Sequence, residues 1–377
     1  MIEVLLVSPR LLPESLSYCG DHAYTDTLLQ HPPAGVCYHH YDELLASGQL
    51  RRNRFLQAAS YYLTQGGFLP PDMWFEALSG DFAPDILHIY GFSATVSLKS
   101  KRQIPVVLGQ GTGGALDLRF YHGWEQKRIR QTRWRKMLYL KLVGAYDTSQ
   151  NPRNAAAIHV WSEFSKSLHL AEGLLRPHQI EVIAPGLPYY GHRRQGLNSD
   201  VVTFLFIGRD FDRKNGPLMV DAFHRVRDKH SSVRLILVGI TPGSQTITEE
   251  GITHHQFVPR HELYERIYPQ ADVLVLPSKA EGFGLVLLEA MSFGMPVISI
   301  QAWAMPEIVI DGENGFLVAP NSVDELADRM SRLVEQPPLL AHMRQRAQEV
   351  FMEKFSIDEH NRRLRKIYDQ VLAANTR

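Results

Sequence analysis

The sequence has few cysteines, no net charge and no set of residues spaced as metal ligands. Its 377 residues include only two cysteines, Cys19 and Cys37, which are too few for a disulfide framework or a cysteine metal cluster, so a reduced cytoplasmic setting is expected. Forty basic residues balance forty acidic ones, which removes the global positive field that nucleic-acid binding uses. Seventeen histidines are scattered without metal-ligand spacing. We therefore expect no metal and no nucleic-acid partner.

Long hydrophobic runs are also missing. No uncharged apolar run approaches the roughly 18 residues that a membrane-spanning helix needs. The first residues, Met-Ile-Glu-Val-Leu-Leu-Val, carry an acid at position 3 and predict a buried strand rather than a signal peptide. We expect a cytoplasmic protein that reaches a membrane only as a peripheral partner of its inner face.

Short apolar runs alternate with longer amphipathic stretches, a pattern that predicts parallel α/β sheets. The length favours two domains, and a stretch rich in proline, glycine and polar residues at 184–200 marks the linker. We predict an N-terminal domain over 1–190, a second domain over 191–355 and a C-terminal helix over 356–377. The strands are predicted at 4–8, 86–90, 106–108, 156–161, 203–207, 234–238, 273–276 and 296–300, and the last helices at 324–334, 339–351 and 357–372.

A glycine-bearing loop follows the predicted strand 273–276 and leads into a helix. In an open α/β sheet, ligands bind at the carboxyl ends of the strands. Backbone N–H groups near residues 283–285 suit a diphosphate there, and the glycines Gly282 and Gly284 allow close approach. Glu281 and Glu289 place two carboxylates where they can bind sugar hydroxyls. The alternative is that both acids only favour the positive end of the helix or solvate a surface.

A second loop follows the predicted strand 203–207 in the same way. It reads Gly-Arg-Asp-Phe-Asp-Arg-Lys-Asn-Gly from Gly208 to Gly216. Arg209 and Lys214 supply positive charges that neutralise a diphosphate without a metal and stabilise it as it leaves. A short basic loop taken alone is more often solvated, but here a second phosphate-type loop follows another strand.

Several motifs occur together in an order that is typical of one known family. The most specific is the pair Glu281 and Glu289 within Glu-Gly-Phe-Gly-Leu-Val-Leu-Leu-Glu-Ala-Met. Over residues 155–355 the sequence resembles the retaining GT-B glycosyltransferases of glycosyltransferase family 4, also called glycosyl transferases group 1. Supporting motifs are Gly-Arg at 208–209 with Lys214 and Gly216, Val-Trp-Ser-Glu at 160–163, Pro-Gly at 185–186, Pro-Val-Ile at 296–298, Pro-Glu-Ile-Val at 306–309 and Asn-Gly-Phe-Leu-Val at 314–318.

The resemblance implies a GT-B fold, with two Rossmann-like domains and a cleft between them. The first domain would bind the acceptor and the second the nucleotide-sugar donor, and the terminal helix would pack back on the first domain. The family transfers a sugar from a nucleotide diphosphate to a hydroxyl, keeps the anomeric configuration and uses no metal or other cofactor. The acceptor would be a carbohydrate, a lipid or a small molecule.

The resemblance also implies roles for individual residues. Arg209 and Lys214, after Gly208, would hold the diphosphate, and Glu289 the ribose. Glu281 would hold the transferred sugar, and Arg209, Lys214 and Glu281 are the catalytic candidates. The nucleobase would lie near 257–260, around Val258. The other donor-binding candidates are Gly282, Phe283, Gly284 and Leu285.

The N-terminal half departs from the family pattern. The glycine-rich loop after the first strand is replaced by a poor match that ends at Gly20, and a surface turn is an equal alternative. Where the family often has a histidine, after the strand 106–108, this sequence has Gln110. His88 and His122 are the remaining candidates, and for His88 a structural, hydrogen-bonded histidine is the stronger alternative.

Residues 126–141 combine seven basic side chains with a tryptophan and several aliphatic residues. A basic amphipathic helix of this kind rests on anionic membranes. The alternative is a solvated helix that packs its apolar side on the N-terminal sheet.

Two other functions remain open at this point. One is a noncatalytic nucleotide-sugar-binding protein, which the missing N-terminal histidine favours. The other is a nucleotide-sugar epimerase of the same fold, which would need an acid and a base near the sugar. No convincing acid–base set stands beside Arg209 and Lys214.

Overall fold

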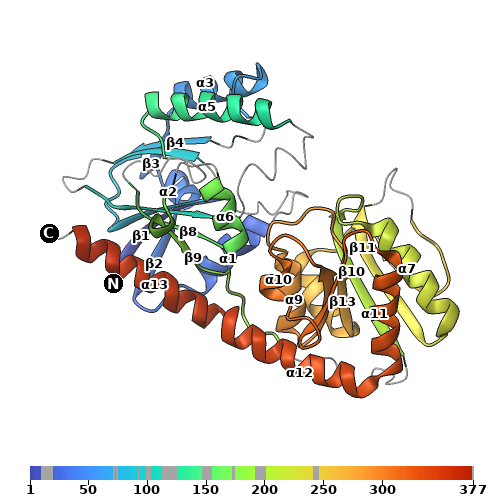
Figure 1. Ribbon diagram of the computed structural model, residues 1–377. Coiled ribbons are helices and arrows are strands. Elements are labelled where there is room, and N and C mark those ends of the chain that lie inside the picture. The colour runs from blue at the N-terminus through green and yellow to red at the C-terminus, as the bar shows by residue number, and fades with distance from the viewer. Residues whose placement is uncertain are drawn as a thin grey trace. The chain divides into compact units, whose positions relative to one another are not determined.

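The computed structural model describes residues 1–9, 20–70, 73, 75–91, 93–98, 103–111, 125–146, 155–171, 175–191, 201–240 and 246–375. The chain forms two compact units (Figure 1). The first contains Met1–Gly186 together with Asp358–Arg377, and the second contains Leu187–Ile357. The second unit therefore begins at Leu187, compared with the boundary at 190/191 expected from the sequence.

The first unit is built on a parallel six-stranded sheet in the order β2-β1-β5-β7-β8-β9. All five residues of β5 are buried, as expected for a strand with both faces covered. A smaller sheet, β3-β4-β6, lies beside it. The strands are β1 (Ile2–Val7), β2 (Val36–His40), β3 (Leu50–Arg52), β4 (Phe75–Gly80), β5 (Ile86–Tyr90), β6 (Ser93–Leu98), β7 (Val106–Gln110), β8 (Ala155–Val160) and β9 (Ile180–Val182). The helices are α1 (Gly20–Gln30), α2 (Tyr41–Ala46), α3 (Arg54–Gln65), α5 (Gln126–Leu142) and α6 (Glu163–Ala171), with a short 3₁₀ turn η1 (Pro177–Gln179).

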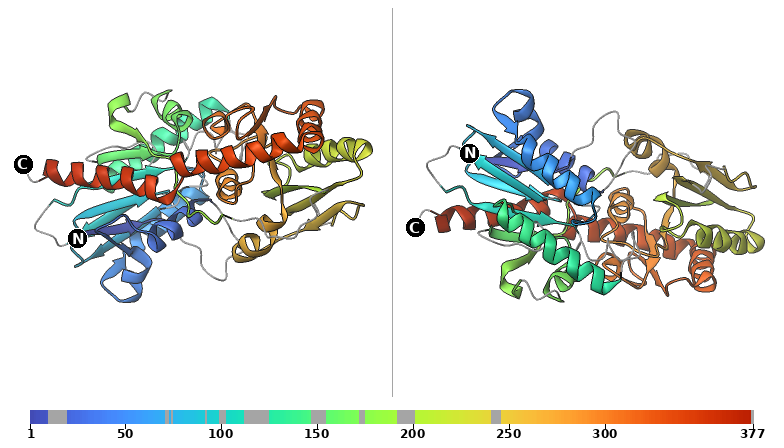
Figure 2. Two further views of the ribbon diagram at one scale, coloured as in Figure 1. Left: turned by 90° about the horizontal axis from the view of Figure 1, so that it is seen from below. Right: turned by 90° about the horizontal axis from the view of Figure 1, so that it is seen from above.

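Helices α3 and α5 lie side by side over the smaller sheet (Figure 2). The hydroxyls of Ser60 and Tyr139 are 2.7 Å apart and join the two helices. Tyr139 and Leu140 of α5 pack with Leu69 and Phe75 in a separate hydrophobic cluster. One side of α5 is therefore committed to the protein interior.

The C-terminal helix α13 (Ile357–Asn375) packs on the first unit. Its buried residues follow a three- and four-residue spacing, which places them on one stripe of the helix. They are His360, Leu364, Ile367, Tyr368 and Val371. Hydrogen bonds from Asn361 to the carbonyl of His31 and from Asn375 to the carbonyl of Gln103 hold it along its length.

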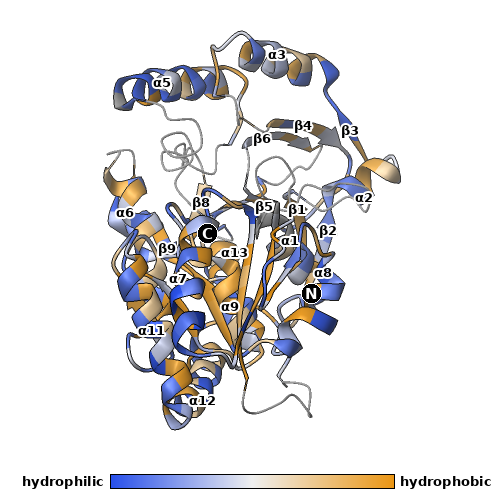
Figure 3. Cartoon of the chain, turned by 90° about the vertical axis from the view of Figure 1, so that its right-hand side faces the viewer, coloured by the Kyte–Doolittle hydropathy of each residue, from blue (hydrophilic) through white to orange (hydrophobic). Residues whose placement is uncertain are grey.

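The second unit is a parallel six-stranded sheet in the order β12-β11-β10-β13-β14-β15. Helices α7 and α11 pack together on one face, and α9 lies on the other (Figure 1). Helix α9 is almost wholly hydrophobic (Figure 3), as its burial requires. The strands are β10 (Val202–Asp210), β11 (Val233–Ile240), β12 (Ile252–His255), β13 (Val273–Leu276), β14 (Val297–Ile300) and β15 (Gly315–Val318). The helices are α7 (Gly216–Lys229), α8 (Arg260–Glu262), η3 (Leu263–Ile267), η4 (Tyr268–Gln270), α9 (Leu285–Ser292), α10 (Met305–Ile308), α11 (Val323–Glu335) and α12 (Pro337–Lys354).

Strands β10 and β13 are neighbours in this sheet. Because both are parallel, their carboxyl ends meet at one edge, and the two loops singled out in the sequence lie there together.

Candidate functional site

The loop after β10 folds back tightly on its own strand. A Cβ atom at Gly208 would lie 2.7 Å from Cβ of Lys214, so only glycine leaves room for this lysine. The N–H of Lys214 donates to the carbonyl oxygen of Asp210 at 2.9 Å, and Asn215 ends the loop with a left-handed φ of 62°. The glycine and the turn together direct Lys214 toward the next strand.

The Lys214 ammonium forms an ion pair with the Glu281 carboxylate of the neighbouring loop. The two side chains are 13% and 11% exposed, and the Ser278 hydroxyl donates to the same Glu281 oxygen at 3.4 Å. Burial lowers the pKa of Lys214 more than the Glu281 charge raises it. Burial also pushes the pKa of Glu281 upward, but the positive charges of Lys214 and Arg213 outweigh it and lower that pKa overall. Glu281 is therefore ionised at neutral pH, as a hydroxyl-binding carboxylate must be.

Arg213 holds the two loops together. The Nη1 of Arg213 donates to the carbonyl oxygen of Ala280 at 2.9 Å. The backbone N–H of Lys279 donates to the carbonyl oxygen of Arg213, also at 2.9 Å. Its Nε lies 3.2 Å from Asp210. Arg213 was not predicted as a site residue from the sequence, although its place between Arg209 and Lys214 was a usable signal.

Arg209 is exposed at the carboxyl end of β10. It precedes Lys214 in the sequence and lies at the same edge of the sheet as Lys214 and Glu281. Across from it, Gly282 and the buried Phe283 lead to Gly284, whose φ of 80° requires glycine and directly precedes α9. At the start of α9 the N–H of Leu287 donates to the carbonyl oxygen of Gly284 at 2.8 Å, whereas the N–H groups of Leu285 and Val286 have no acceptor within the helix and lie at its positive dipole end. The edge thus combines exposed positive charge with backbone donors.

Glu289 lies in α9 and is buried. Its Oε1 accepts from the Tyr264 hydroxyl at 2.7 Å and lies 3.5 Å from Arg260, and its Oε2 accepts from the Tyr268 hydroxyl at 2.6 Å. Tyr264 also packs against Tyr190, with ring centroids 4.7 Å apart. Three protein donors therefore occupy the carboxylate, and its predicted contact with a ribose stays a prediction. The two tyrosines were not predicted from the sequence.

The nucleobase is expected to bind around residues 257–260. Val258 is buried, two residues before Arg260. Arg260 stacks over the ring of Tyr264 at 5.0 Å, while Phe257 is 47% exposed.

The four N-terminal candidates have different surroundings. Gly20 is the first residue of α1, and His122 lies outside the described residues. His88 is fully buried, with Nδ1 2.7 Å from the Tyr368 hydroxyl and Nε2 3.1 Å from Nε2 of His159. This is the geometry of a structural histidine, the alternative that the sequence left open.

Gln110 closes β7 at the carboxyl edge of the first sheet. Its Oε1 is buried and has no hydrogen-bond partner among the described residues. Ser8 lies just after β1, and its hydroxyl is also buried with no hydrogen-bond partner among the described residues. Ser8 was not a candidate in the sequence analysis.

Comparison with known proteins places part of the chain beside known glycosyltransferases. The family description "Glycosyl transferases group 1" matches residues 192–350. A D-inositol 3-phosphate glycosyltransferase of Frankia alni is 31% identical over 187 residues, which cover 43% of this chain and 46% of the relative. An MMP alpha-(1->4)-mannosyltransferase of Mycolicibacterium hassiacum is 28% identical over 232 residues, 58% of this chain and 56% of the relative. The chain thus spans about half the length of the curated relatives it matches.

Solved structures resemble the chain over nearly its whole length. Sucrose-phosphate synthase from Thermosynechococcus elongatus has a TM-score of 0.68 at 16% identity and covers 99% of this chain, with all of that structure matched. Anabaena HepE in complex with UDP and glucose has a TM-score of 0.64 at 17% identity and covers 98% of this chain and 100% of that one. The resemblance found in the sequence is therefore confirmed over residues 192–350, which match the glycosyl transferases group 1 family, and the chain has the GT-B fold.

Proposed function

We propose that this protein is a retaining glycosyltransferase that moves a sugar from a nucleotide diphosphate to an acceptor hydroxyl without a metal ion. The observation that carries the proposal is the buried Lys214–Glu281 pair, which lies with Arg209 at the carboxyl edge of β10 and β13. A HepE structure holds UDP and glucose, which makes a uridine diphosphate sugar the first donor to test.

The chemistry places opposite demands on the two ends of the bond that breaks. Breaking a glycosyl phosphate leaves positive charge on the sugar and negative charge on the diphosphate. Lys214, Arg209 and the N–H groups at the start of α9 are fixed donors that stabilise the leaving diphosphate, and this effect is largest in the transition state. Glu281 binds sugar hydroxyls through charge-assisted hydrogen bonds. With these groups in place, the leaving phosphate accepts the acceptor's proton on the same face, which retains the configuration.

The test is donor turnover in excess chelator. We expect one nucleotide sugar from a panel to bind and react in the presence of the chelator, and a product with the donor's anomeric configuration by NMR. Arg209→Ala should raise the donor KM about 10- to 100-fold, because a charged hydrogen bond contributes about 1.5–3 kcal/mol. Arg234→Ala is the matched control, since Arg234 is an exposed arginine at the opposite, amino end of the same sheet. Loss of turnover on chelation, or an inverted product, would refute the mechanism.

The two alternatives give different outcomes in the same experiment. A noncatalytic binding protein would bind the donor but leave it intact across a broad acceptor panel. An epimerase would convert one nucleotide sugar into another with no acceptor present. Among the residues that the structure describes beside Glu281, no acid–base pair favours the epimerase.

We further propose that α5 attaches the protein to anionic membranes. Among the described residues no helix is both long and apolar enough to cross a bilayer. Helix α5, however, exposes Trp134, Leu138 and Leu142 at four-residue spacing, on a helix with seven basic residues and no acid. Its buried side packs inside the first unit, as the alternative expectation for this helix has it, and the exposed apolar residues lie on a different face, which we propose for the membrane.

Vesicle sedimentation tests this attachment. The protein should sediment with phosphatidylglycerol-containing vesicles at low salt and dissociate as salt rises. The triple variant Trp134→Ser, Leu138→Ser, Leu142→Ser should bind at least about tenfold more weakly, because each buried CH₂ contributes about 0.8 kcal/mol. Met352→Ser, which removes an exposed apolar residue of α12, should bind normally. Sedimentation that is equal for neutral and anionic vesicles would contradict the proposal.

A further inference from the structure

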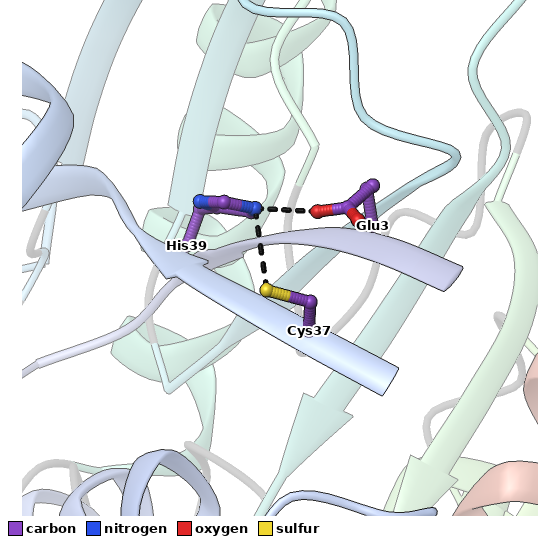
Figure 4. A group of neighbouring side chains, drawn as sticks. All are labelled: Glu3, Cys37 and His39. Carbon is purple, nitrogen blue, oxygen red and sulfur yellow. Dashed lines mark hydrogen bonds and ion pairs between the residues drawn. The ribbon is translucent and has the colours of Figure 1, made fainter. Parts of the chain in front are cut away.

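Three side chains of different chemistry meet on the first two strands of the chain (Figure 4). Nε2 of His39 is 2.6 Å from Oε2 of Glu3 and 3.6 Å from Sγ of Cys37. One ligand atom from each residue lies within 4.8 Å of the others. The parallel register explains the grouping: Glu3 pairs with Cys37, and His39 pairs with Leu5, so all three side chains leave the same face of the β1–β2 ladder.

We propose that Glu3, Cys37 and His39 bind one Zn²⁺ ion. Zinc takes thiolate, imidazole and carboxylate ligands in a tetrahedron with bonds of about 2.0–2.3 Å, which sets its ligand atoms about 3.3–3.7 Å apart. The sulfur and nitrogen atoms already stand at that separation. The oxygen–nitrogen pair needs to open by about 0.7 Å, which a rotation of the long Glu3 side chain supplies. The soft thiolate and the imidazole select zinc over magnesium or calcium.

The surroundings of the three ligands suit a metal. The backbone N–H of Glu3 donates to the Asp85 carboxylate at 2.9 Å, and the His39 ring packs against Phe82 with centroids 4.8 Å apart. The first contact fixes the backbone of Glu3, and the second restrains the His39 ring. The side chains of His39 and Glu3 are 32% and 40% exposed, so a water molecule reaches the fourth position.

The site is separate from the proposed donor site. It lies in the first unit, toward the start of β1, whereas the donor residues belong to the second unit. The ion would join β2, an edge strand, to β1. The zinc would therefore link the two strands, and it plays no part in the proposed metal-independent transfer.

Zinc titration of the full chain tests the proposal. Protein freed of metal by a chelator is titrated with zinc chloride against a chromophoric zinc indicator, and with cobalt chloride. We expect one high-affinity site, a sulfur-to-cobalt charge-transfer band and a Tm that rises with zinc. Cys37→Ser should lower zinc affinity at least tenfold and abolish the band, and His39→Gln should lower affinity similarly. Cys19→Ser is the matched control and should retain both signals.

Two results would overturn the proposal. One is a wild-type protein that binds no zinc, and the other is zinc binding that survives unchanged in Cys37→Ser. The metal-free Tm of each variant shows that it folds, so weaker binding cannot be mistaken for unfolding. Glu3→Gln, which keeps the side chain's size, provides the third ligand test.

Discussion

Replacing Lys214 with methionine is expected to lower kcat/KM for donor turnover by about 10²–10³-fold, the usual cost of removing one fixed donor from a developing negative charge. The same change leaves the Glu281 carboxylate buried without its partner. Breaking a buried pair in this way costs about 3–5 kcal/mol, so the free energy of unfolding of the second unit should fall as well. Both quantities are measured on the same preparation, by steady-state kinetics and by urea unfolding.

A double variant separates these two effects. Lys214→Met with Glu281→Gln removes both charges, so most of the lost stability should return. Activity should not return, because the leaving diphosphate still lacks its cation and the transferred sugar lacks the Glu281 carboxylate. Lys279→Met removes an equal charge from an exposed position in the loop after β13 and should change neither quantity much. Recovery of activity in the double variant would show that Lys214 acts only by supporting the fold.

The fold was largely predictable because its signals are local. Each predicted strand overlaps an observed one, since a buried parallel strand is a short apolar run and needs no knowledge of its neighbours. The predicted start of the helix after Pro337 and Pro338 was less accurate. The sequence treats them as a break before a helix at 339, but α12 begins at Pro337 itself. Proline is well tolerated in the first turn, where its missing N–H has no partner to lose.

The candidate site was predictable only in part, for a physical reason. The two loops could be found because each directly follows an apolar strand. The pairing of Lys214 with Glu281 could not, because those residues are 67 positions apart and meet only through the adjacency of β10 and β13. The tyrosines on Glu289 come from the irregular helical stretch 263–270, whose side-chain directions no simple periodicity reports.

His88 shows the same limit over a longer separation. Its partner Tyr368 lies 280 residues away on α13. The sequence offered a histidine at a strand end and left two roles open. Only the return of the last helix to the first unit supplies the hydroxyl that completes its hydrogen bonding.

Three buried histidines lie where α13 packs on the rest of the first unit: His88, His159 and His360. They predict a steep loss of stability in acid. Burial lowers the pKa of His88 to about 3 and that of His360 to about 4, and it lowers the pKa of His159 as well. Each folded-state pKa is below its unfolded value of about 6.5. The unfolded chain therefore binds more protons in acid. The stabilisation is complete above pH 6.5 and is lost as the pH falls toward 3 to 4.

The geometry explains why these rings resist protonation. Nδ1 of His360 lies 2.7 Å from the carbonyl oxygen of Ala184 and must donate to it, so Nε2 accepts from the Tyr24 hydroxyl at 3.1 Å. A second proton would place two donors face to face unless that hydroxyl turned away. Nε2 of His88 faces Nε2 of His159 at 3.1 Å, and only one of them can carry the shared proton. The neutral forms are therefore the ones that the fold accommodates.

Urea unfolding at a series of pH values measures the effect. Between pH 6.5 and 5.0, His88 and His360 should each remove about 2 kcal/mol from the free energy of unfolding, since each pH unit is worth about 1.4 kcal/mol per proton. His360→Gln keeps a side chain that can donate to Ala184 but cannot titrate, so its pH slope should be shallower by about 1.4 kcal/mol per unit. His342→Gln, at an exposed position of α12, should keep the wild-type slope. If His360→Gln also keeps it, acid acts on other groups, and the histidines do not control how α13 is held.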